Sequence, residues 1–360
     1  MRKFSLSYYD FNLPIELIAQ YPLKKRSESR LLVLNRQKKS FIKAKFSEIY
    51  KFIPENSLLI FNQSKVIPAR LFGIKESTGG RVEFLLLTPL PLLNIKTKDK
   101  SIWNTCTAQG LLRPSKGIKV GMKIVFRDDI YLKTIKKYEY GKWDIELYWK
   151  GNLIDILKKI GHIPLPPYIK RKDEEIDHNR YQTVFAKEEK IGSVAAPTAG
   201  LHFDQKTIDD IKQKDIDIDF ITLYVGAGTF APIRCDDIRD HKMHSEYVEV
   251  SQETAKKIMH AKEKGKKIIP VGTTSVRTLE GVYEKLGRVD EYVGWIDLFI
   301  YPGFKFKVID HMITNFHLPK SSLLVLVSAF AGRNFILDAY NFAIKNKYRF
   351  FSYGDCMLIL

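Results

Sequence analysis

Three short stretches rich in small residues lie where predicted strands end, and they hold the side chains whose types could do chemistry. They read "AAPTAGLHF" (195–203), "GAGTFA" (226–231) and "GTTSVR" (272–277). Small residues let a backbone approach a ligand closely. Loops at the carboxyl ends of strands are also where α/β folds bind ligands. We therefore expect the three loops to form one pocket.

Two of these loops could recognise charge or a flat ligand. "GTTSVR" places hydroxyls and free N–H groups at the positive end of a helix, which suits a carboxylate or phosphate, and Arg277 adds a positive charge. The alternative is simple N-capping by Thr274 or Ser275. "GAGTFA" matches a dinucleotide-binding pattern, but Pro232 follows and no helix opens, so we reject that interpretation. Close approach to a flat ligand and a glycine-rich turn both remain open.

Histidines near these loops are candidates for proton transfer. His202 and His317 lie in similar surroundings, "LHF" and "FHL", and an imidazole exchanges protons near neutral pH. A structural role is the alternative for each. His241, His244 and Glu246 in "HKMHSE" resemble a metal-binding pattern only weakly, because no helical frame or further ligand accompanies them. We therefore expect hydrogen bonding or phosphate contact there, and no metal.

The elements that must position these residues change in character along the chain. From residue 57 to about residue 150, short strands follow one another with turn signals between them, as in a small antiparallel barrel or sandwich. Beyond that segment, strands alternate with helices, which indicates an α/β fold. At 360 residues the chain exceeds the usual size of a single core. We therefore predict two domains, the β-rich one inserted near the start of the other.

Composition restricts the partners and the compartment. Lys and Arg number 59 against 41 Asp and Glu, a formal net charge of +18, which favours a nucleic-acid or other polyanionic partner unless it reflects a bias of the source genome. "HIPLPPYIKR" and "RYQTVF" could stack an unpaired base or form a rigid connector between domains. Three widely spaced cysteines fit a reducing cytoplasm. We expect no signal peptide and no membrane span.

Several long motifs, occurring in one order, closely resemble the S-adenosylmethionine:tRNA ribosyltransferase-isomerases of queuosine biosynthesis. The motifs include "HIPLPPYIKR", "RYQTVFAK", "GSVAAPTAGLHF", "VGAGTF", "HKMHSE", "GTTSVRTLE" and "NFHLPKSSLLVLVSAFAG". The similarity runs from the N-terminus to "YRFFSYGDCMLIL" and is weakest between about residues 88 and 159. Tyr224 stands where the family usually has His, and Lys65 where it usually has Arg.

The resemblance implies a fold and a reaction. The fold is α/β, with a barrel-like α/β main domain (1–64 and 152–360) and an inserted small antiparallel β-barrel domain (65–151). The reaction transfers and isomerises the ribosyl moiety of S-adenosyl-L-methionine, a co-substrate, onto the 7-aminomethyl-7-deazaguanine wobble base of tRNA. Epoxyqueuosine forms, and adenine and methionine leave. The implied partner is the tRNA anticodon stem-loop that carries this base, and we expect a cytoplasmic monomer.

The reaction gives roles to the motif residues. The sulfonium acidifies the neighbouring methylene, the attacking amine must be neutral, and the departing adenine needs a proton or a hydrogen-bond donor. The predicted catalytic residues are His202 and His317, with Glu246 or His244 in reserve. Two loops are predicted to lie against the adenosine, with the residues Ala195, Ala196, Pro197, Thr198, Gly200, Gly226, Gly228, Thr229 and Phe230. The methionine carboxylate or a tRNA phosphate is predicted to bind at Thr273, Thr274, Ser275 and Arg277.

Two other functions compete with this one. A non-enzymatic tRNA-binding protein would explain the charge and the aromatic residues, but it would not need three strand-end loops. An S-adenosylmethionine-dependent RNA methyltransferase would release S-adenosylhomocysteine instead of adenine and methionine. The sequence has no convincing glycine-rich start of a Rossmann domain for that class.

Overall fold

Two β-sheets form the β-layer of the larger domain. The computed structural model describes residues 2–97, 102–226, 228 and 232–360. One sheet has the strand order β15–β3–β13–β14–β16 and the other β17–β18–β1–β2, and they meet where Val271 and Ile313 form a parallel bridge. The strands are β1 (Arg30–Asn35), β2 (Ser40–Lys45), β3 (Ser57–Asn62), β13 (Asp217–Tyr224), β14 (Glu246–Val250), β15 (Lys267–Pro270), β16 (Tyr292–Ile296), β17 (Met312–Asn315) and β18 (Cys356–Ile359).

The sequence of each strand matches its place in these sheets. Strand β3, "SLLIFN", is buried along its whole length between the parallel strands β13 and β15. A strand covered on both faces needs such a continuous apolar run. Strand β14, "EYVEV", pairs in antiparallel fashion and alternates between buried and half-exposed residues. The parallel strands therefore point their carboxyl ends to one edge, where the small-residue loops follow.

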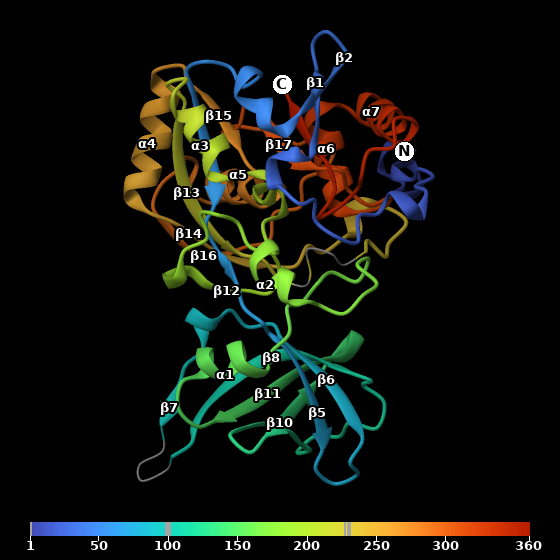
Figure 1. Ribbon diagram of the computed structural model, residues 1–360, viewed down its shortest axis with the longest axis vertical. Coiled ribbons are helices and arrows are strands. Elements are labelled where there is room, and N and C mark those ends of the chain that lie inside the picture. Colours follow the sequence, from blue (N-terminus) through green and yellow to red (C-terminus); the bar gives the residue numbers. More distant parts are fainter. Residues whose placement is uncertain (1, 98–101, 227, 229–231) are drawn as a thin grey trace.

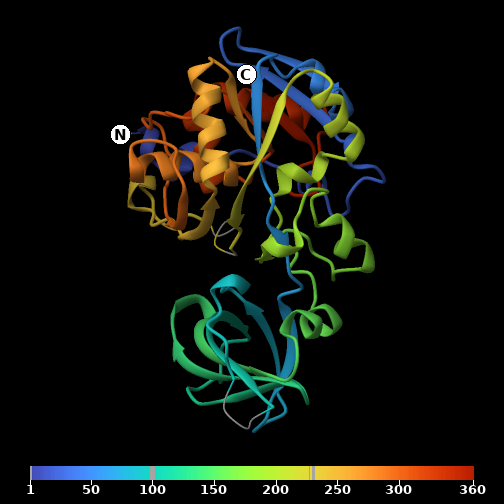
Figure 2. The same cartoon turned by 90° about the vertical axis from the view of Figure 1, so that its left-hand side faces the viewer.

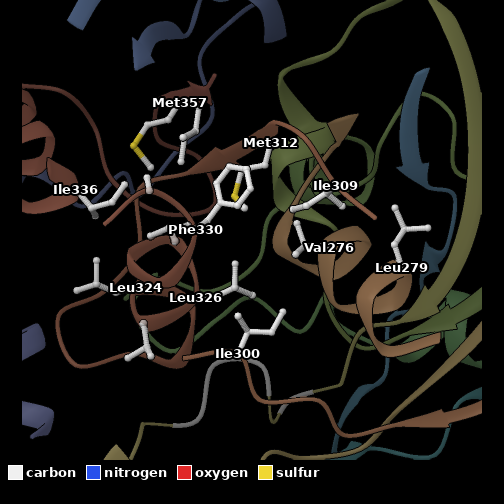
Figure 3. Packing of buried hydrophobic residues seen from close by; sticks show 14 of the residues in the cluster. Val276, Leu279, Ile300, Ile309, Met312, Leu324, Leu326, Phe330, Ile336 and Met357 are labelled. Carbon is white, nitrogen blue, oxygen red and sulfur yellow. The ribbon is translucent and has the colours of Figure 1, made fainter. Parts of the chain in front are cut away.

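Helices cover the sheets and fill the core of the larger domain. They are α2 (Glu175–Arg180), α3 (Gln205–Lys212), α4 (Gln252–Glu263), α5 (Thr273–Leu286), α6 (Ser322–Ala331) and α7 (Arg333–Lys345). Side chains of Asp204, Ser251 and Ser321 accept backbone N–H bonds and so cap α3, α4 and α6. Figure 3 shows Val276 and Leu279 of α5 and Leu326 of α6, which all belong to the main hydrophobic core.

The strands between residues 70 and 149 form a closed antiparallel barrel, which lies below the larger domain in Figure 1. The strand order is β11–β10–β9–β5–β6–β8, and β8 pairs with β11 to close it. Trp143 and Trp149 lie in its own core, which helix α1 (Leu153–Ile160) also covers. The strands are β5 (Arg70–Lys75), β6 (Arg81–Leu86), β7 (Lys96–Thr97, added at the edge), β8 (Asn104–Arg113), β9 (Lys123–Arg127), β10 (Ile130–Lys137) and β11 (Lys142–Trp149).

Two chain segments run side by side between the barrel and the larger domain (Figure 2). Strand β4 (Lys65–Val66) pairs in parallel with β12 (Ile191–Ser193). Arg70 and His162 exchange backbone hydrogen bonds of 2.8 and 3.3 Å. The predicted fold class, a barrel-like α/β domain with an inserted antiparallel β-barrel, is confirmed, although the main β-layer consists of two sheets. The division at residues 64–65 and 151–152 stays a prediction.

Helices α6 and α7 follow one another with the single residue Gly332 between them. No single described helix is long and apolar enough to cross a membrane, and these two satisfy that test only together, with a bend of 114° between them.

Candidate active site

A cavity of about 320 Å³ opens at the carboxyl ends of strands β12, β13, β15 and β17. This volume is at the lower end of the range of pockets that bind small molecules. The predicted loops after β12 and β15 both contribute to its wall, as does Val225 directly after β13. The rest of the cavity wall comes from a fourth segment within residues 314–323 and from Tyr168, Phe351 and Ser352. The structure thus brings the three strand ends together with the segment that carries His317. It adds Phe351 and Ser352, which the sequence did not indicate.

The loop after β12 supplies a wall of small side chains. Ala196, Thr198 and Ala199 line the cavity. Gly200 faces the other way, because a Cβ atom there would lie 2.7 Å from Phe185 Cζ. Its small size therefore serves packing inside the protein. Ala195 and Pro197 belong to the same loop but do not line the cavity.

The loop after β15 presents the N-terminus of helix α5 to the cavity. Gly272 has a φ of +92°, which favours glycine, and Thr273 and Thr274 follow it on the wall. In the described part of the chain, Thr274 Oγ1 is buried without a hydrogen-bond partner. Ser275 Oγ instead donates to the Val271 carbonyl at 3.0 Å. Thr273 and Thr274, together with the positive helix end, can therefore receive an anion, whereas the Ser275 hydroxyl is engaged within the helix.

His317 lies on the cavity wall. Its Nε2 is 2.9 Å from Thr314 Oγ1, and its backbone N–H donates to the Tyr340 hydroxyl at 2.9 Å. Burial lowers the pKa of His317 to about 3, so the imidazole is neutral at physiological pH. A neutral ring can accept a proton or hold a hydrogen bond next to a ligand.

His202 lies behind this wall. It is buried, its Nε2 is 3.1 Å from Asn315 Nδ2, and its Nδ1 is 2.8 Å from Ser29 Oγ. Burial lowers the pKa of His202 to about 3. The ring lines only a second, much smaller cavity of about 20 Å³, beside Arg26 and Arg180. His202 and His317 are therefore separated by Asn315, whereas the sequence suggested two equivalent histidines.

Arg277 and Glu246 form a buried ion pair away from the cavity wall. Arg277 donates to a carboxylate oxygen of Glu246, and also to the Leu298 carbonyl at 3.1 Å. Glu246 Oε1 accepts the Gly226 N–H at 3.3 Å. The pair links helix α5 to strand β14 and to the loop after β13. The donors of Arg277 are thus engaged within the protein, and the structure does not bring Arg277 to the cavity with Thr273 and Thr274.

The remaining predicted residues lie around the loop after β13. Gly228 approaches His244 so closely that a Cβ atom on Gly228 would lie 2.6 Å from the ring. Neither Gly228 nor His244 lines the cavity. The predicted Thr229 and Phe230 lie outside the described residues. Within the described ranges, no three His, Cys, Asp or Glu side chains come close enough together to hold a metal ion.

Sequence reasoning missed Asn315, Phe351 and Ser352, and it did not place Tyr168 of "HIPLPPYIKR" at the strand-end pocket. The Tyr168 hydroxyl is 2.6 Å from Ser352 Oγ, and its ring lies 4.7 Å from that of Phe351. Phe351 has a φ of +70°, a strained conformation for a bulky residue that often marks a functional site. Asn315 is the first residue of "NFHLPKSS", two positions before the candidate His317, so its position next to that histidine could have indicated it. Nothing in the sequence pointed to Phe351 or Ser352.

These features define an α/β protein that has a cavity at its strand ends and carries an inserted β-barrel. The family model described as "Queuosine biosynthesis protein" matches residues 6–359. The chain therefore belongs to this family of queuosine biosynthesis proteins.

Individual relatives agree with the family match. The chain is 51% identical to the S-adenosylmethionine:tRNA ribosyltransferase-isomerase of Nitratidesulfovibrio vulgaris strain DP4, over 99% of this chain and 97% of that protein. It is 48% identical to the protein of the same name from Halothermothrix orenii, over 98% of both. The fold is similar to the crystal structure of S-adenosylmethionine tRNA ribosyltransferase from Thermotoga maritima, whose sequence is 35% identical to this chain. The match covers 98% of this chain and 100% of that chain. The TM-score is 0.54.

Proposed function

We propose that this protein is an S-adenosylmethionine:tRNA ribosyltransferase-isomerase. It transfers and isomerises the ribosyl moiety of S-adenosylmethionine onto the 7-aminomethyl-7-deazaguanine wobble base of tRNA, and it releases adenine and methionine. The observation that carries this proposal is similarity along almost the whole chain to relatives of that name at about 50% identity. The cavity at the strand ends supports it, because it combines small walls with a helix N-terminus.

S-adenosylmethionine fits the chemistry of this cavity. Ala196 and Ala199 leave steric room on one wall for a nucleoside, and Tyr168 and Phe351 offer aromatic faces. The N-terminus of α5, with Thr273 and Thr274, suits the methionine carboxylate. The predicted contacts at Gly226, Gly228, Thr229 and Phe230 stay predictions, as does any role of Arg277 beyond its pairing with Glu246.

His317 is our candidate for proton transfer. The methylene beside the sulfonium must lose a proton, and a histidine can accept that proton only in its neutral form. His317 is neutral and lies on the cavity wall. His202 reaches the same ligand only through Asn315, so we assign it a positioning role. Glu246 and His244 lie away from the wall, and we place them behind His317 as candidates for proton transfer.

The partner is tRNA, and we propose that its anticodon stem-loop contacts the barrel. Tyr131 and Tyr148 stack there with ring centroids 4.6 Å apart and planes 10° apart. Lysines lie over these rings and over Trp103: Lys123, Lys133 and Lys150. Aromatic rings with cations between them are typical of surfaces that hold unpaired bases and phosphates. A cytoplasmic monomer is part of the same proposal.

Product analysis tests the reaction. Purified protein is incubated with S-adenosylmethionine and tRNA bearing the aminomethyl deazaguanine, and the released small molecules are identified. We expect adenine and methionine, and only with the modified tRNA. S-adenosylhomocysteine would instead indicate a methyltransferase. Tight tRNA binding without any product would indicate a binding protein, and either result would overturn the proposal.

A further inference from the structure

Asn315 carries an unused acceptor in the wall of the cavity. It lies at the end of strand β17, is 3% exposed and lines the cavity. Within the described ranges its Oδ1 is buried and has no hydrogen-bond partner. A buried amide oxygen without a partner costs free energy, and in the wall of a cavity a ligand can supply the missing donor.

The surroundings of the Asn315 amide fix which end is nitrogen. The Nδ2 group donates to the Phe351 carbonyl at 2.9 Å and lies 3.1 Å from His202 Nε2. A carbonyl can only accept, so the nitrogen must face Phe351, and His202 Nε2 then accepts the second proton. His202 consequently carries its own proton on Nδ1 and donates it to Ser29 Oγ, 2.8 Å away. Both amide protons are used, and Oδ1 is left as an acceptor.

This acceptor lies close to the N-terminus of helix α5. Strands β15 and β17 are neighbours at this edge, since the Gly272 N–H donates to the Ile313 carbonyl at 2.8 Å. Thr274 therefore follows one strand end, and Asn315 lies at the adjacent one. Each has a buried oxygen without a partner among the described residues. The wall thus offers an anion site beside a neutral acceptor.

An α-amino acid carries the complementary pair of groups on one carbon. Its carboxylate suits the helix N-terminus, and its ammonium needs a nearby acceptor. No acidic side chain is among the described residues that line the cavity, and the Lys320 ammonium pairs with Asp10 at 2.6 Å. The ammonium must therefore meet a neutral acceptor, and an amide oxygen without another donor is suited to that role.

We propose that Asn315 Oδ1 accepts a hydrogen bond from the α-ammonium of the methionine portion of S-adenosylmethionine, and that His202 is a positioning residue that holds the amide in this orientation. The proposal rests on the proposed function, because it takes S-adenosylmethionine as the ligand. It also sets the direction of that ligand, with its amino-acid end between the ends of β15 and β17.

Calorimetric titration with two ligands tests the role of Asn315. Wild-type protein and Asn315→Leu are titrated with S-adenosylmethionine and with its analogue that lacks the α-amino group. We expect wild type to prefer S-adenosylmethionine by about tenfold or more, and Asn315→Leu to lose most of that preference. The ratio of the two Kd values does not depend on the fraction of protein that is folded. Asn315→Ala provides a second variant if Asn315→Leu does not fold. Asn334→Leu, on the exposed side of α7, is the matched control and keeps the wild-type ratio.

The positioning role of His202 has its own measurement. His202→Phe keeps a ring of similar shape against Phe46 but removes the acceptor of the amide proton. We expect the Kd ratio to fall, because the amide can then turn its nitrogen toward the ligand. His178→Phe, at an exposed position of α2, leaves the ratio unchanged. An unchanged ratio in His202→Phe would overturn the positioning role.

The outcomes separate this inference from the function on which it rests. If wild type binds S-adenosylmethionine and releases adenine and methionine, but Asn315→Leu keeps the full preference for the amino group, only the inference is overturned. If wild type does not bind S-adenosylmethionine, the function and the inference both fail. Loss of the preference in Asn315→Leu, with Asn334→Leu unchanged, supports the inference.

Discussion

At the scale of single residues, burial separates side chains that look alike in the sequence. His202 and His317 have similar neighbours along the chain, yet only His317 reaches the cavity. Gly200 and Ala196 lie in one loop of small residues, yet Gly200 packs inward and Ala196 faces the ligand site. The sequence predicted correctly that this loop lies at the cavity. It could not predict which side each residue faces, because a tight turn has no fixed period.

The buried histidines make stability fall in mild acid. The pKa of His317 is about 3 in the folded protein and near 6.5 in the unfolded chain, so between these values the unfolded chain binds the extra proton. The free energy of unfolding therefore decreases as pH falls from 7 to 5, by about 2 kcal/mol for this histidine. Urea unfolding at pH 7 and pH 5 measures this decrease. We expect the decrease in the free energy of unfolding to be smaller in His317→Gln than in wild type by about 2 kcal/mol. His178→Gln should behave like wild type, and equal losses in all three would contradict the prediction.

Two substitutions in the loop after β12 should have opposite effects. Ala196→Leu places its bulk in the cavity, so we expect the Kd for S-adenosylmethionine to rise at least about tenfold with little change in Tm. Gly200→Ala places a Cβ atom against Phe185 and Thr183, so we expect the free energy of unfolding to fall by about 1–3 kcal/mol with ligand affinity retained. Calorimetric titration and urea unfolding of both variants check this. Ligand loss in Gly200→Ala at unchanged stability would contradict it.

At the scale of elements, the sequence predicted the alternation of strands and helices well, because buried parallel strands and amphipathic helices have local periods. It also indicated that the loops after β12, β13 and β15 would meet. The contribution of Phe351 and Ser352 was missed because it depends on long-range pairing: strand β18, from the end of the chain, inserts between β17 and β1. The positive φ of Phe351 has no local sequence signal, since glycine is absent there.

The ion pair between Arg277 and Glu246 is expected to hold helix α5 against strand β14. Both side chains are 3% exposed, so removing one partner leaves an unpaired buried charge. We expect Glu246→Gln to lower the free energy of unfolding by about 3–5 kcal/mol. The double variant with Arg277→Gln should cost less than the sum of the single variants in urea unfolding. The exposed pair Arg239 and Asp237 offers a control, in which Asp237→Asn changes stability little. Strict additivity at Glu246 and Arg277 would refute the coupling.

At the scale of the whole molecule, positive charge is concentrated on the barrel. Residues 65–151 contain 17 Lys and Arg against 8 Asp and Glu, about half of the net charge of +18 in about a quarter of the chain. The barrel lies below the larger domain in Figures 1 and 2, and the two segments at β4 and β12 join them. Charge on the barrel can therefore hold a long RNA while the strand ends act on one base.

Salt dependence of tRNA binding tests this division of labour. Each phosphate contact releases counterions, so log K falls with log salt concentration by about 0.7–0.9 per contact. Replacing Lys123, Lys133 and Lys150 of the barrel by Gln removes three cations that lie over aromatic rings. We expect tRNA binding to weaken and the slope to become shallower by about 2–3, while calorimetric titration shows an unchanged Kd for S-adenosylmethionine. The matched triple variant replaces three exposed lysines of the larger domain: Lys256 in α4, Lys264 directly after α4, and Lys285 in α5. It should keep the wild-type slope. Equal slopes in both triple variants would place the RNA elsewhere on the molecule.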